Sequence, residues 1–290
     1  MTKKKFDGIL ICSDIDNTLL YHLPGRETAY VPEKTIEAIK YFQNNGGRFT
    51  LATGRFPRFA ADNLKQYVTP NAPLVTLNGA VIYDGESNLE LYTCPIEDDI
   101  ARLTYDVIEH FPKMKWMGIQ CDGANYIIQR RNDGGYKYRD AMIGGSRFKN
   151  IDTREEFAAT FADVTLLKML YVFPSRVSAA ARDEIVAMFP EYGVARSWPN
   201  GVELQSADAG KGNSTRRLAE LLGDVRLLVC VGDYENDISM LKSADIGYAV
   251  ANACKMVKAA AHRVTNLPCR DGAIAEIIEE LEREYALEEG

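Results

Sequence analysis

Two acidic stretches follow apolar runs of the chain and contain residue types that could do chemistry. In LICSDIDNTLL the run ends in Asp14 and Asp16, and in VCVGDYENDISML a second run ends in Asp233, with Asp237 four residues later. Carboxylates this close repel one another unless a cation or a shared proton compensates them. Carboxylate oxygens suit Mg²⁺, which binds few of them together with water and phosphate. A carboxylate here could also act as a nucleophile or as a general acid or base.

Each stretch taken alone has a simpler interpretation as the capped start of a helix. Asp16 or Asn17 could cap one helix, and the GDYEND stretch fits another. Two strand ends of this type in one sheet are hard to explain as two caps, because about four acids would crowd one edge without a compensating charge. We therefore interpret the two stretches as parts of one site.

Two further stretches supply groups that a bound phosphate would need. The run FTLATGR ends in Thr53, Gly54 and Arg55, which offer a hydroxyl and a backbone amide to a phosphate oxygen. Lys211 lies just before a predicted helix and could supply positive charge to a carboxylate nucleophile and a phosphate. Thr53 alone is uninformative, and a lysine at a helix start is usually solvated and mildly disfavoured by the helix dipole.

The elements that must position these groups alternate between strands and helices. The strand-like runs are 8–13, 48–54 and 73–79, the helix-like patterns between them are 32–47 and 57–67, and the same rhythm returns over 225–286. This alternation predicts an α/β fold, a Rossmann-like doubly wound parallel sheet. Such sheets bind ligands at the carboxyl ends of their strands. Asp14 and Asp233 stand at two of these predicted ends.

The middle of the chain has a different pattern. Its strands outnumber its helices and its turns are frequent, which predicts an α+β domain inserted into the outer one. We place the insert at 85–197, and the outer domain at 1–84 and 198–290. A length of 290 residues with 46% hydrophobic content is enough for two packed cores.

Composition narrows the class of partner. The net charge of -7 disfavours binding to a nucleic-acid backbone or an anionic membrane surface. No apolar run approaches the roughly 18 residues of a membrane span, and the short basic start does not continue as a signal peptide. The six cysteines are scattered without metal-ligand spacing, which favours reduced thiols in a cytoplasmic protein. Small molecules are the expected partners, with no nucleic acid and no membrane.

In order and context, four motifs of the chain resemble those of the haloacid dehalogenase-like (HAD) superfamily. They are DIDNT at 14–18, Thr53 in LATGR, Lys211, and GDYEND at 232–237. The long insert between the second and third motifs resembles the class IIB cap of the Cof-type subgroup. The resemblance implies a Mg²⁺-dependent phosphatase acting on small phosphorylated metabolites, such as sugar phosphates. The outer segments would form the catalytic core, and the insert would set substrate specificity.

The resemblance also implies catalytic roles. Asp14 would attack phosphorus and become an aspartyl phosphate. Asp16 would protonate the leaving oxygen and later activate the water that hydrolyses the intermediate. Thr53 would bond a phosphoryl oxygen, and Lys211 would neutralise Asp14 and the transferring group.

Metal and substrate ligands follow from the same motifs. Mg²⁺ would be held by Asp14, the backbone carbonyl of Asp16, and Asp233, with Asp237 supporting the metal from its surroundings. The residues expected to bind phosphate or substrate are Asn17, Thr18, Gly54, Arg55 and Asn236. Asn17 departs from the glycine of many relatives. In the insert, Asn125, Tyr136 and Lys137 could touch a sugar or second phosphate, although a solvated hairpin is the simpler interpretation.

Two other functions remain open from the sequence. A phosphosugar mutase resembles the phosphatase in its motifs and would also keep Asp16. A non-catalytic phosphometabolite-binding protein could have kept the pocket without turning over its ligand. The sequence identifies neither the substrate nor the oligomeric state.

Overall fold

The chain forms two compact units in the computed structural model. The structure describes residues 3–22, 29–57, 60, 64, 66–97, 102–112, 114, 116–121, 124–129, 147–150 and 153–288. One unit comprises Met1–Thr93 and Gly210–Gly290, and we call it the core unit. The other, Cys94–Ala209, is called the insert unit.

A parallel sheet with the strand order β16-β15-β14-β1-β4 forms the centre of the core unit. Its strands are β1 (Ile9–Ser13), β4 (Arg48–Leu51), β14 (Leu227–Gly232), β15 (Ile246–Ala249) and β16 (Arg263–Val264). All neighbouring pairs run parallel, and every residue of β1 and β14 is buried. Central strands covered on both faces read as continuous apolar runs, which is why both were recognisable in the sequence.

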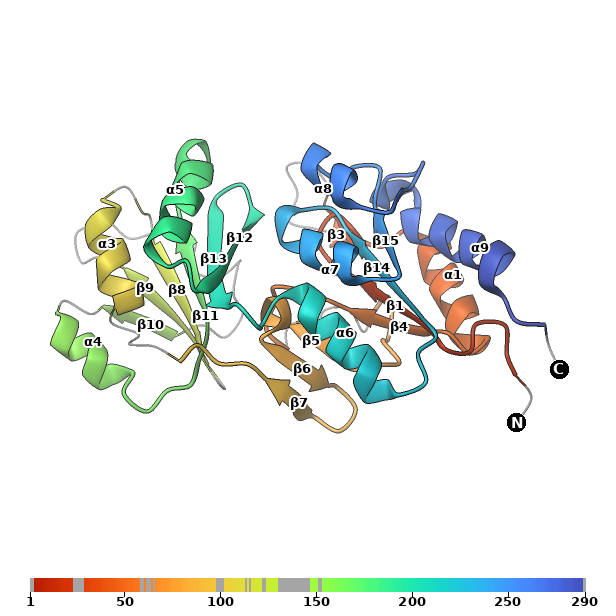
Figure 1. Ribbon diagram of the computed structural model, residues 1–290, viewed down its shortest axis with the longest axis horizontal. Coiled ribbons are helices and arrows are strands. Elements are labelled where there is room, and N and C mark those ends of the chain that lie inside the picture. Colours follow the sequence, from red (N-terminus) through yellow and green to blue (C-terminus); the bar gives the residue numbers. More distant parts are fainter. Residues whose placement is uncertain are drawn as a thin grey trace. The chain divides into compact units, whose positions relative to one another are not determined.

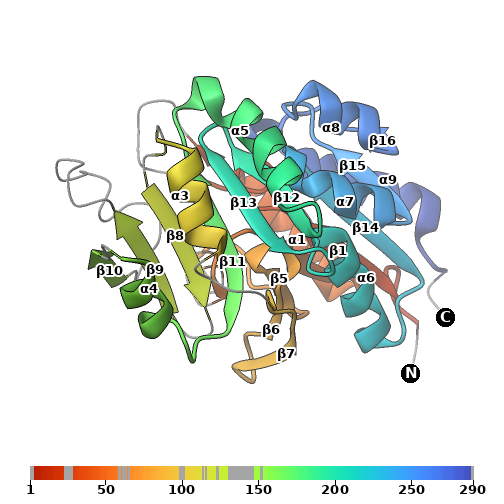
Figure 2. The ribbon, with the colours of Figure 1, turned by 60° about the vertical axis from the view of Figure 1, so that its left-hand side comes forward.

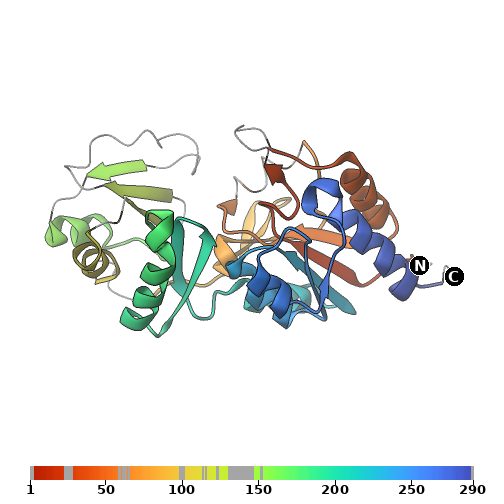
Figure 3. The same ribbon diagram turned by 90° about the horizontal axis from the view of Figure 1, so that it is seen from above.

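Helices cover both faces of this sheet, as Figures 1 and 3 show. The helices are α1 (Glu33–Asn44), α6 (Lys211–Leu222), α7 (Ile238–Ser243), α8 (Lys255–Ala260) and α9 (Ala273–Tyr285). On one face α1 packs beside α9, and on the other α6 packs beside α7. The fold is therefore the doubly wound α/β sheet that the sequence predicts. Among the described residues, no helix combines the length and the apolar character that crossing a membrane requires.

Smaller strands complete the core unit beside the central sheet. An antiparallel sheet is formed by β5 (Leu74–Thr76), β6 (Val81–Asp84) and β7 (Leu89–Thr93). A parallel bridge between Ala52 and Val75 joins β5 to the segment that follows β4. A two-stranded ladder pairs β2 (Tyr21–His22) with β3 (Ala29–Tyr30). Short 3₁₀ turns lie at Leu77–Gly79, Glu235–Asp237 and Cys269–Asp271. The turn at Glu235–Asp237 follows β14, which ends at Gly232, and the turn at Leu77–Gly79 directly follows β5.

In the insert unit the sheet is largely antiparallel, with the order β10-β9-β8-β11-β13-β12. Its strands are β8 (Trp116–Cys121), β9 (Ala124–Gln129), β10 (Arg147–Asn150), β11 (Leu166–Val172), β12 (Tyr192–Trp198) and β13 (Gly201–Ser206). The helices α3 (Val107–His110), α4 (Arg154–Thr160) and α5 (Ser175–Met188) lie on one face, with a π-helical turn at Arg102–Asp106 before α3 (Figures 2 and 3). Met169 and Tyr171 of β11 pack into the core on this helical face. Their neighbours on β11 point to the opposite face because side chains alternate along a strand.

The bounds of the two units differ from the predicted bounds at both junctions. The sequence places the insert at 85–197, whereas the insert unit is Cys94–Ala209. The first junction moves because β7 hydrogen-bonds to β6 and so stays with the core unit. The second moves because β13 pairs with β11 and β12 inside the insert sheet. Hydrogen bonding between strands decides both positions.

Some local predictions also need adjustment. Lys211 is the first residue of α6 and not a loop residue before it. The β2 and β3 pair, β10, α4, β12 and β13 were not predicted as elements. Tyr136 and Lys137 lie outside the described residues.

Candidate active site

Three adjacent parallel strands deliver the candidate site residues to one edge of the core sheet. Asp14 follows β1, Thr53 follows the end of β4, and Asp233 follows β14. The backbone N–H of Asp14 donates to the carbonyl of Val231 at 2.9 Å, which fixes the end of β1 against β14. Because parallel neighbours end at the same edge, side chains far apart in the sequence meet here.

Lys211 connects the first and last of these segments. Its Nζ lies 2.7 Å from Asp14 Oδ1 and 2.6 Å from Asp237 Oδ1, and its side chain is fully buried. Burial alone would lower the pKa of Lys211, but the two carboxylates outweigh it and raise that pKa above the usual range. Lys211 is therefore a fixed cation in contact with Asp14. These contacts also explain a lysine at a helix start, where the dipole disfavours positive charge.

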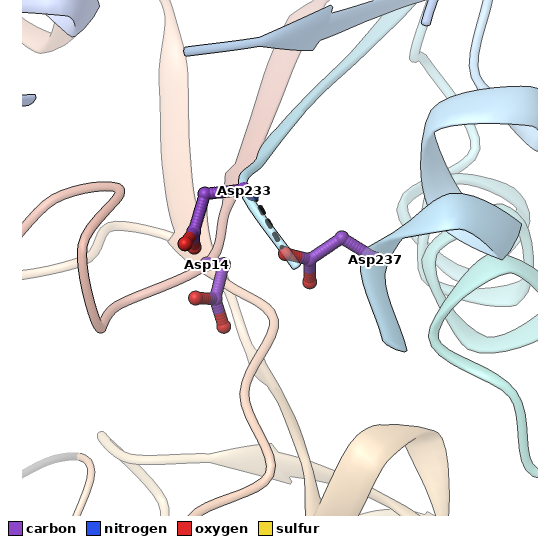
Figure 4. A group of neighbouring side chains, drawn as sticks. All are labelled: Asp14, Asp233 and Asp237. Carbon is purple, nitrogen blue, oxygen red and sulfur yellow. Dashed lines mark hydrogen bonds between the residues drawn. The ribbon is translucent and has the colours of Figure 1, made fainter. Parts of the chain in front are cut away.

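Three buried acids surround this lysine. One carboxylate oxygen from each of Asp14, Asp233 and Asp237 lies within 4.8 Å of the other two (Figure 4). Burial raises the pKa of Asp14 to about 7, with Lys211 opposing the rise and Asp237 adding to it. Burial, followed by the charges of Asp14 and Asp237, raises the pKa of Asp233 to about 8. Three acids thus share one lysine, and the cluster lacks positive charge.

Asp237 has a supporting position in this cluster. Its Oδ2 accepts a hydrogen bond from the backbone N–H of Asp233 at 2.9 Å (Figure 4). The same oxygen accepts from the backbone N–H of Tyr234 at 3.0 Å, while Oδ1 accepts from Lys211. A Cβ added to Gly232 would lie 2.5 Å from the Cβ of Asp237, so only glycine fits beside this carboxylate. Asp237 therefore holds the loop after β14 and orients Lys211.

Thr18 has a similar supporting contact. Its hydroxyl is buried and donates to Asp233 Oδ1 at 2.9 Å. The sequence assigned Thr18 to phosphate or substrate binding, whereas the structure shows its side chain bonded to an acid. Thr18 thereby ties the DIDNT loop to the GDYEND loop.

The oxygens left over suit a divalent cation. Within the described part of the chain, Asp14 Oδ2 and Asp233 Oδ2 accept no hydrogen bond from the protein, and the backbone carbonyl of Asp16 accepts none. Mg²⁺ takes one or two carboxylates and completes its shell with waters and phosphate oxygens. The donor set and the shortage of positive charge both fit such an ion, with Asp14 and Asp233 as its side-chain ligands.

Asp16 stands apart from the acid cluster. Arg55 donates to both of its oxygens, from Nη2 at 2.5 Å and from Nε at 3.0 Å, and His22 Nε2 lies 2.7 Å from Oδ1. Burial would raise the pKa of Asp16, but the hydrogen bonds and charges of His22 and Arg55 outweigh it and lower that pKa to about 2. The side chain of Asp16 remains 42% exposed. Asp16 is therefore an ionised and accessible carboxylate.

The loop after β4 is shaped by its own backbone. The Thr53 hydroxyl accepts the backbone N–H of Arg55 at 3.1 Å, which leaves its own proton available for an acceptor. The Arg55 carbonyl accepts from Leu77 at 3.1 Å. Gly54 lies between the two, half-buried. Arg55, assigned from the sequence to phosphate or substrate, contacts Asp16 in this structure.

Asn78 links this loop to the GDYEND loop. Its N–H donates to the Thr53 carbonyl at 2.9 Å, and its Oδ1 accepts from Asn236 Nδ2 at 3.2 Å. Its φ of 55° lies in the left-handed region that asparagine tolerates better than most residues. The Asn236 amide, expected to bind phosphate or substrate, thus contacts Asn78.

Asn17 also adopts a left-handed conformation, with φ of 59°. Its N–H donates to Leu20 at 2.8 Å, and its carbonyl accepts from Asn252 Nδ2 at 2.7 Å. Asn252 in turn accepts the backbone N–H of Cys269 at 2.7 Å. The conformation explains why asparagine can stand where many relatives have glycine. The backbone N–H of Asn17 is therefore bonded within the loop.

Sequence reasoning missed two residues that touch the site. His22 contacts Asp16, and Asn252 contacts Asn17. Neither belongs to a motif with recognisable spacing. His22 is one of three histidines in the chain, and that scarcity was the only signal.

Comparison with known protein families gives a match that spans most of the chain. A family model for haloacid dehalogenase-like hydrolases matches residues 11–278. The chain belongs to this family. The HAD resemblance read from the four motifs is therefore confirmed, and so is the prediction of a hydrolase.

Individual relatives cover nearly the whole chain. A Haemophilus influenzae protein, provisionally named a phosphatase, is 29% identical over 93% of this chain and 97% of its own length. The Bacillus subtilis protein YxeH, with a similar provisional name, is 25% identical over 94% and 97%. The solved structure of the HAD subclass IIB sugar phosphatase BT4131 superposes with a TM-score of 0.74 at 22% identity, covering 94% of this chain and 98% of the other. That likeness confirms the class IIB fold.

Proposed function

We propose that this chain is a Mg²⁺-dependent phosphatase that hydrolyses small phosphomonoesters through an aspartyl phosphate on Asp14. One observation carries the proposal. Asp14 is buried at a strand end, 2.7 Å from the ammonium of Lys211 and next to Asp233, and no described residue donates to its Oδ2. A nucleophile, a fixed cation and ligands for a second cation are thus gathered at one point, as phosphoryl transfer requires.

In the first half-reaction, the Asp14 carboxylate would attack phosphorus. Its Oδ1 accepts from Lys211, which fixes the direction of the carboxylate. Lys211 also opposes the rise in the pKa of Asp14 that burial causes, and so favours its ionised form. The Thr53 hydroxyl, with its proton available, would donate to a phosphoryl oxygen. A bound Mg²⁺ would supply further positive charge to the phosphoryl group and to Asp14 and Asp233.

Asp16 would move the protons. Its exposed carboxylate would give a proton to the leaving oxygen and take one from the water that attacks the aspartyl phosphate. The ionised form seen with Arg55 and His22 is the form that a general base requires. For the first half-reaction Asp16 must gain a proton, and we propose that Arg55 leaves it for an anionic group of the substrate.

The insert unit is proposed to select the substrate, with a sugar phosphate or similar metabolite as the expected class. Lys168 and Glu203 form a buried ion pair of 2.6 Å on the sheet face without helices. Gln120 and Gln205 occupy register positions on either side of Lys168, and Asn125 is the register partner of Gln120. The Oε1 of Gln120 is buried without a hydrogen-bond partner among the described residues. Amide, ammonium and carboxylate groups in a row can bind the hydroxyls of a polyol. The sugar phosphatase activity named for BT4131 supports the same class.

The test is phosphate release from a panel of metabolite phosphates, measured with Mg²⁺ and again with excess EDTA. Activity with Mg²⁺ and its loss with EDTA are expected. Acid quenching during turnover, followed by peptide mass spectrometry, should find the phosphoryl group on Asp14. Activity that survives chelation would contradict the metal role, and a phosphoryl group on another residue would contradict the nucleophile. Identifying the organic product separates hydrolysis from a mutase reaction.

A further inference from the structure

His22 lies beside the proton-transferring carboxylate but outside the four motifs. Its Nε2 is 2.7 Å from Asp16 Oδ1. A deprotonated carboxylate only accepts hydrogen bonds, so we assign the hydrogen of this contact to Nε2, with His22 as the donor. The same oxygen also accepts from Arg55, and among the described residues Arg55 is the donor to the second oxygen. If Arg55 moves to a substrate anion, His22 is the described side chain that still holds Asp16.

The position of His22 is fixed by the backbone. Between Asp16 and His22, the N–H groups of Asn17 and Leu20 donate to Leu20 and Ile15 at 2.8 Å and 2.7 Å, so the loop is tightly closed. His22 itself belongs to β2 and pairs with Ala29 of β3.

The far strand of the pair is held in place as well. The Ala29 carbonyl accepts from the Tyr67 hydroxyl at 3.0 Å. The rings of Tyr21 and Tyr30 meet edge to face across the two strands, 5.5 Å apart. The imidazole therefore approaches Asp16 from an anchored strand.

The exposure of both side chains shows that this contact contributes little to the stability of the fold. The side chains of His22 and Asp16 are 43% and 42% exposed. Ion pairs this exposed contribute about 0–1 kcal/mol to stability, because water competes for both groups. Removing His22 should therefore leave the fold intact. Its effect should appear in the orientation of Asp16.

We propose that His22 is a positioning residue, whose Nε2–H holds the Asp16 carboxylate in the orientation needed to protonate the leaving oxygen. The inference rests on the proposed function, in which Asp16 is the general acid. The two can be tested separately, because loss of His22 should reduce activity most when the leaving group needs a proton. Phenolate leaves with difficulty unless protonated, whereas 4-nitrophenolate leaves readily without a proton.

The experiment compares phenyl phosphate with 4-nitrophenyl phosphate, using kcat/KM because it reports the half-reaction in which the leaving group departs. His22→Ala should lose about 10-fold on phenyl phosphate and less than about 2-fold on 4-nitrophenyl phosphate, since general acid catalysis is worth about 10²–10⁴ in rate. His22→Gln can place an N–H near the position of Nε2 and should recover most of the loss. His110→Ala is the matched control, because His110 also lies 2.8 Å from a carboxylate, that of Glu184, with similar exposure.

If the wild type is active on both esters, two results would overturn the role assigned to His22. The first is an equal loss on both esters, which would indicate a structural role. The second is no loss on either ester. A wild type inactive on both esters with Mg²⁺ would instead overturn the proposed function, and this inference with it.

Discussion

The two units of the chain each bury a lysine against acids, but with opposite charge balance. In the insert unit, Lys168 pairs with Glu203 at 2.6 Å, and both side chains are 5% exposed or less. In the core unit, Lys211 faces three clustered acids. In a pair of one lysine and one carboxylate the two charges compensate each other, whereas an excess of buried negative charge is costly unless something compensates it. The core cluster is therefore the one that a bound cation would stabilise.

Within the core unit, the pKa values of the acids also differ with the charges and hydrogen bonds around them. Burial and mutual repulsion raise the pKa values of Asp14 and Asp233, to about 7 and about 8. Asp16 is hydrogen-bonded to His22 and Arg55 and partly exposed, and these two partners lower its pKa to about 2. The DIDNT motif therefore contains two carboxylates of different character, although their sequence contexts are nearly the same. Packing, and not residue type, separates the proposed nucleophile from the proposed proton-transfer group.

The largest expected effect is on activity. Asp14→Asn should reduce phosphate release by at least about 10³-fold, because the covalent route through Asp14 is removed. Its free energy of unfolding should stay the same or rise, because one of the crowded carboxylates becomes neutral. Phosphate release and chemical denaturation measured on the same preparation check both statements. Normal turnover, or marked destabilisation, would remove the contrast between the two clusters.

The balanced pair should behave in the opposite way. Glu203→Gln removes the negative charge that lies 2.6 Å from the buried Lys168 ammonium and should cost about 3–5 kcal/mol of stability. The double variant Lys168→Met with Glu203→Leu should recover most of that loss, because no charge remains buried. Denaturation with guanidinium chloride measures both. A stable Glu203→Gln variant would show that this pair is not equivalent to an isolated buried ion pair.

Mg²⁺ should stabilise the unbalanced cluster. At a free concentration 100 times its dissociation constant, the ion should add about 2.7 kcal/mol to the free energy of unfolding of the EDTA-treated protein. Asp233→Asn should need a higher Mg²⁺ concentration for the same gain, because one ligand is weakened. Thermal unfolding across a Mg²⁺ titration checks this, and calcium-free buffers exclude a competing ion. Equal titrations for the wild type and Asp233→Asn would place the ion elsewhere.

The pH dependence of stability should have two signs. The raised pKa values of Asp14 and Asp233 mean that, without a cation, the folded state keeps protons that the unfolded state has lost between the ordinary value of 3.8 and about 8. Their contribution therefore lowers stability as pH rises through this window, and saturating Mg²⁺ should flatten the slope.

The lowered pKa of Asp16 acts in the other direction. Its stabilisation is present above pH 3.8 and lost as pH falls toward about 2. Denaturation curves at several pH values, with and without Mg²⁺, check both windows. Asp16→Asn should remove the acidic window and leave the neutral one. A metal-free stability that rises from pH 5 to pH 8 in step with Asp14 and Asp233 would contradict the assigned directions.

The smallest effect is expected at an exposed pair. Arg48 contacts both oxygens of Asp224 at 2.5 Å, but the Asp224 side chain is 62% exposed. Asp224→Asn should cost less than about 1 kcal/mol and leave phosphate release unchanged, since water replaces the lost contact. It serves as the control for the buried variants above. A loss comparable to that of Glu203→Gln would mean that burial does not separate the pairs.

Much of the core fold could be predicted from the sequence because its signals are local. The apolar runs that became β1 and β14 are buried along their whole length and therefore show no polar interruption. The acidic residues directly after them mark the strand ends. The insert was harder to delimit, because β12 and β13 are partly polar strands whose membership depends on pairing with β11. Pairing partners distant in sequence leave no local signal.

For the site, the sequence by itself determined which residue types gather at the sheet edge. Asp14, Asp233 and Lys211 could be assigned because strand order and motif order bring them together. Only the tertiary structure decided which partners the oxygens and hydroxyls of the site bond to. Thr18 is used by Asp233, both oxygens of Asp237 are occupied, and Asp16 turns toward Arg55 and His22. The physical reason is that a motif fixes the identity of a side chain, whereas its partners are set by packing between segments up to 215 residues apart.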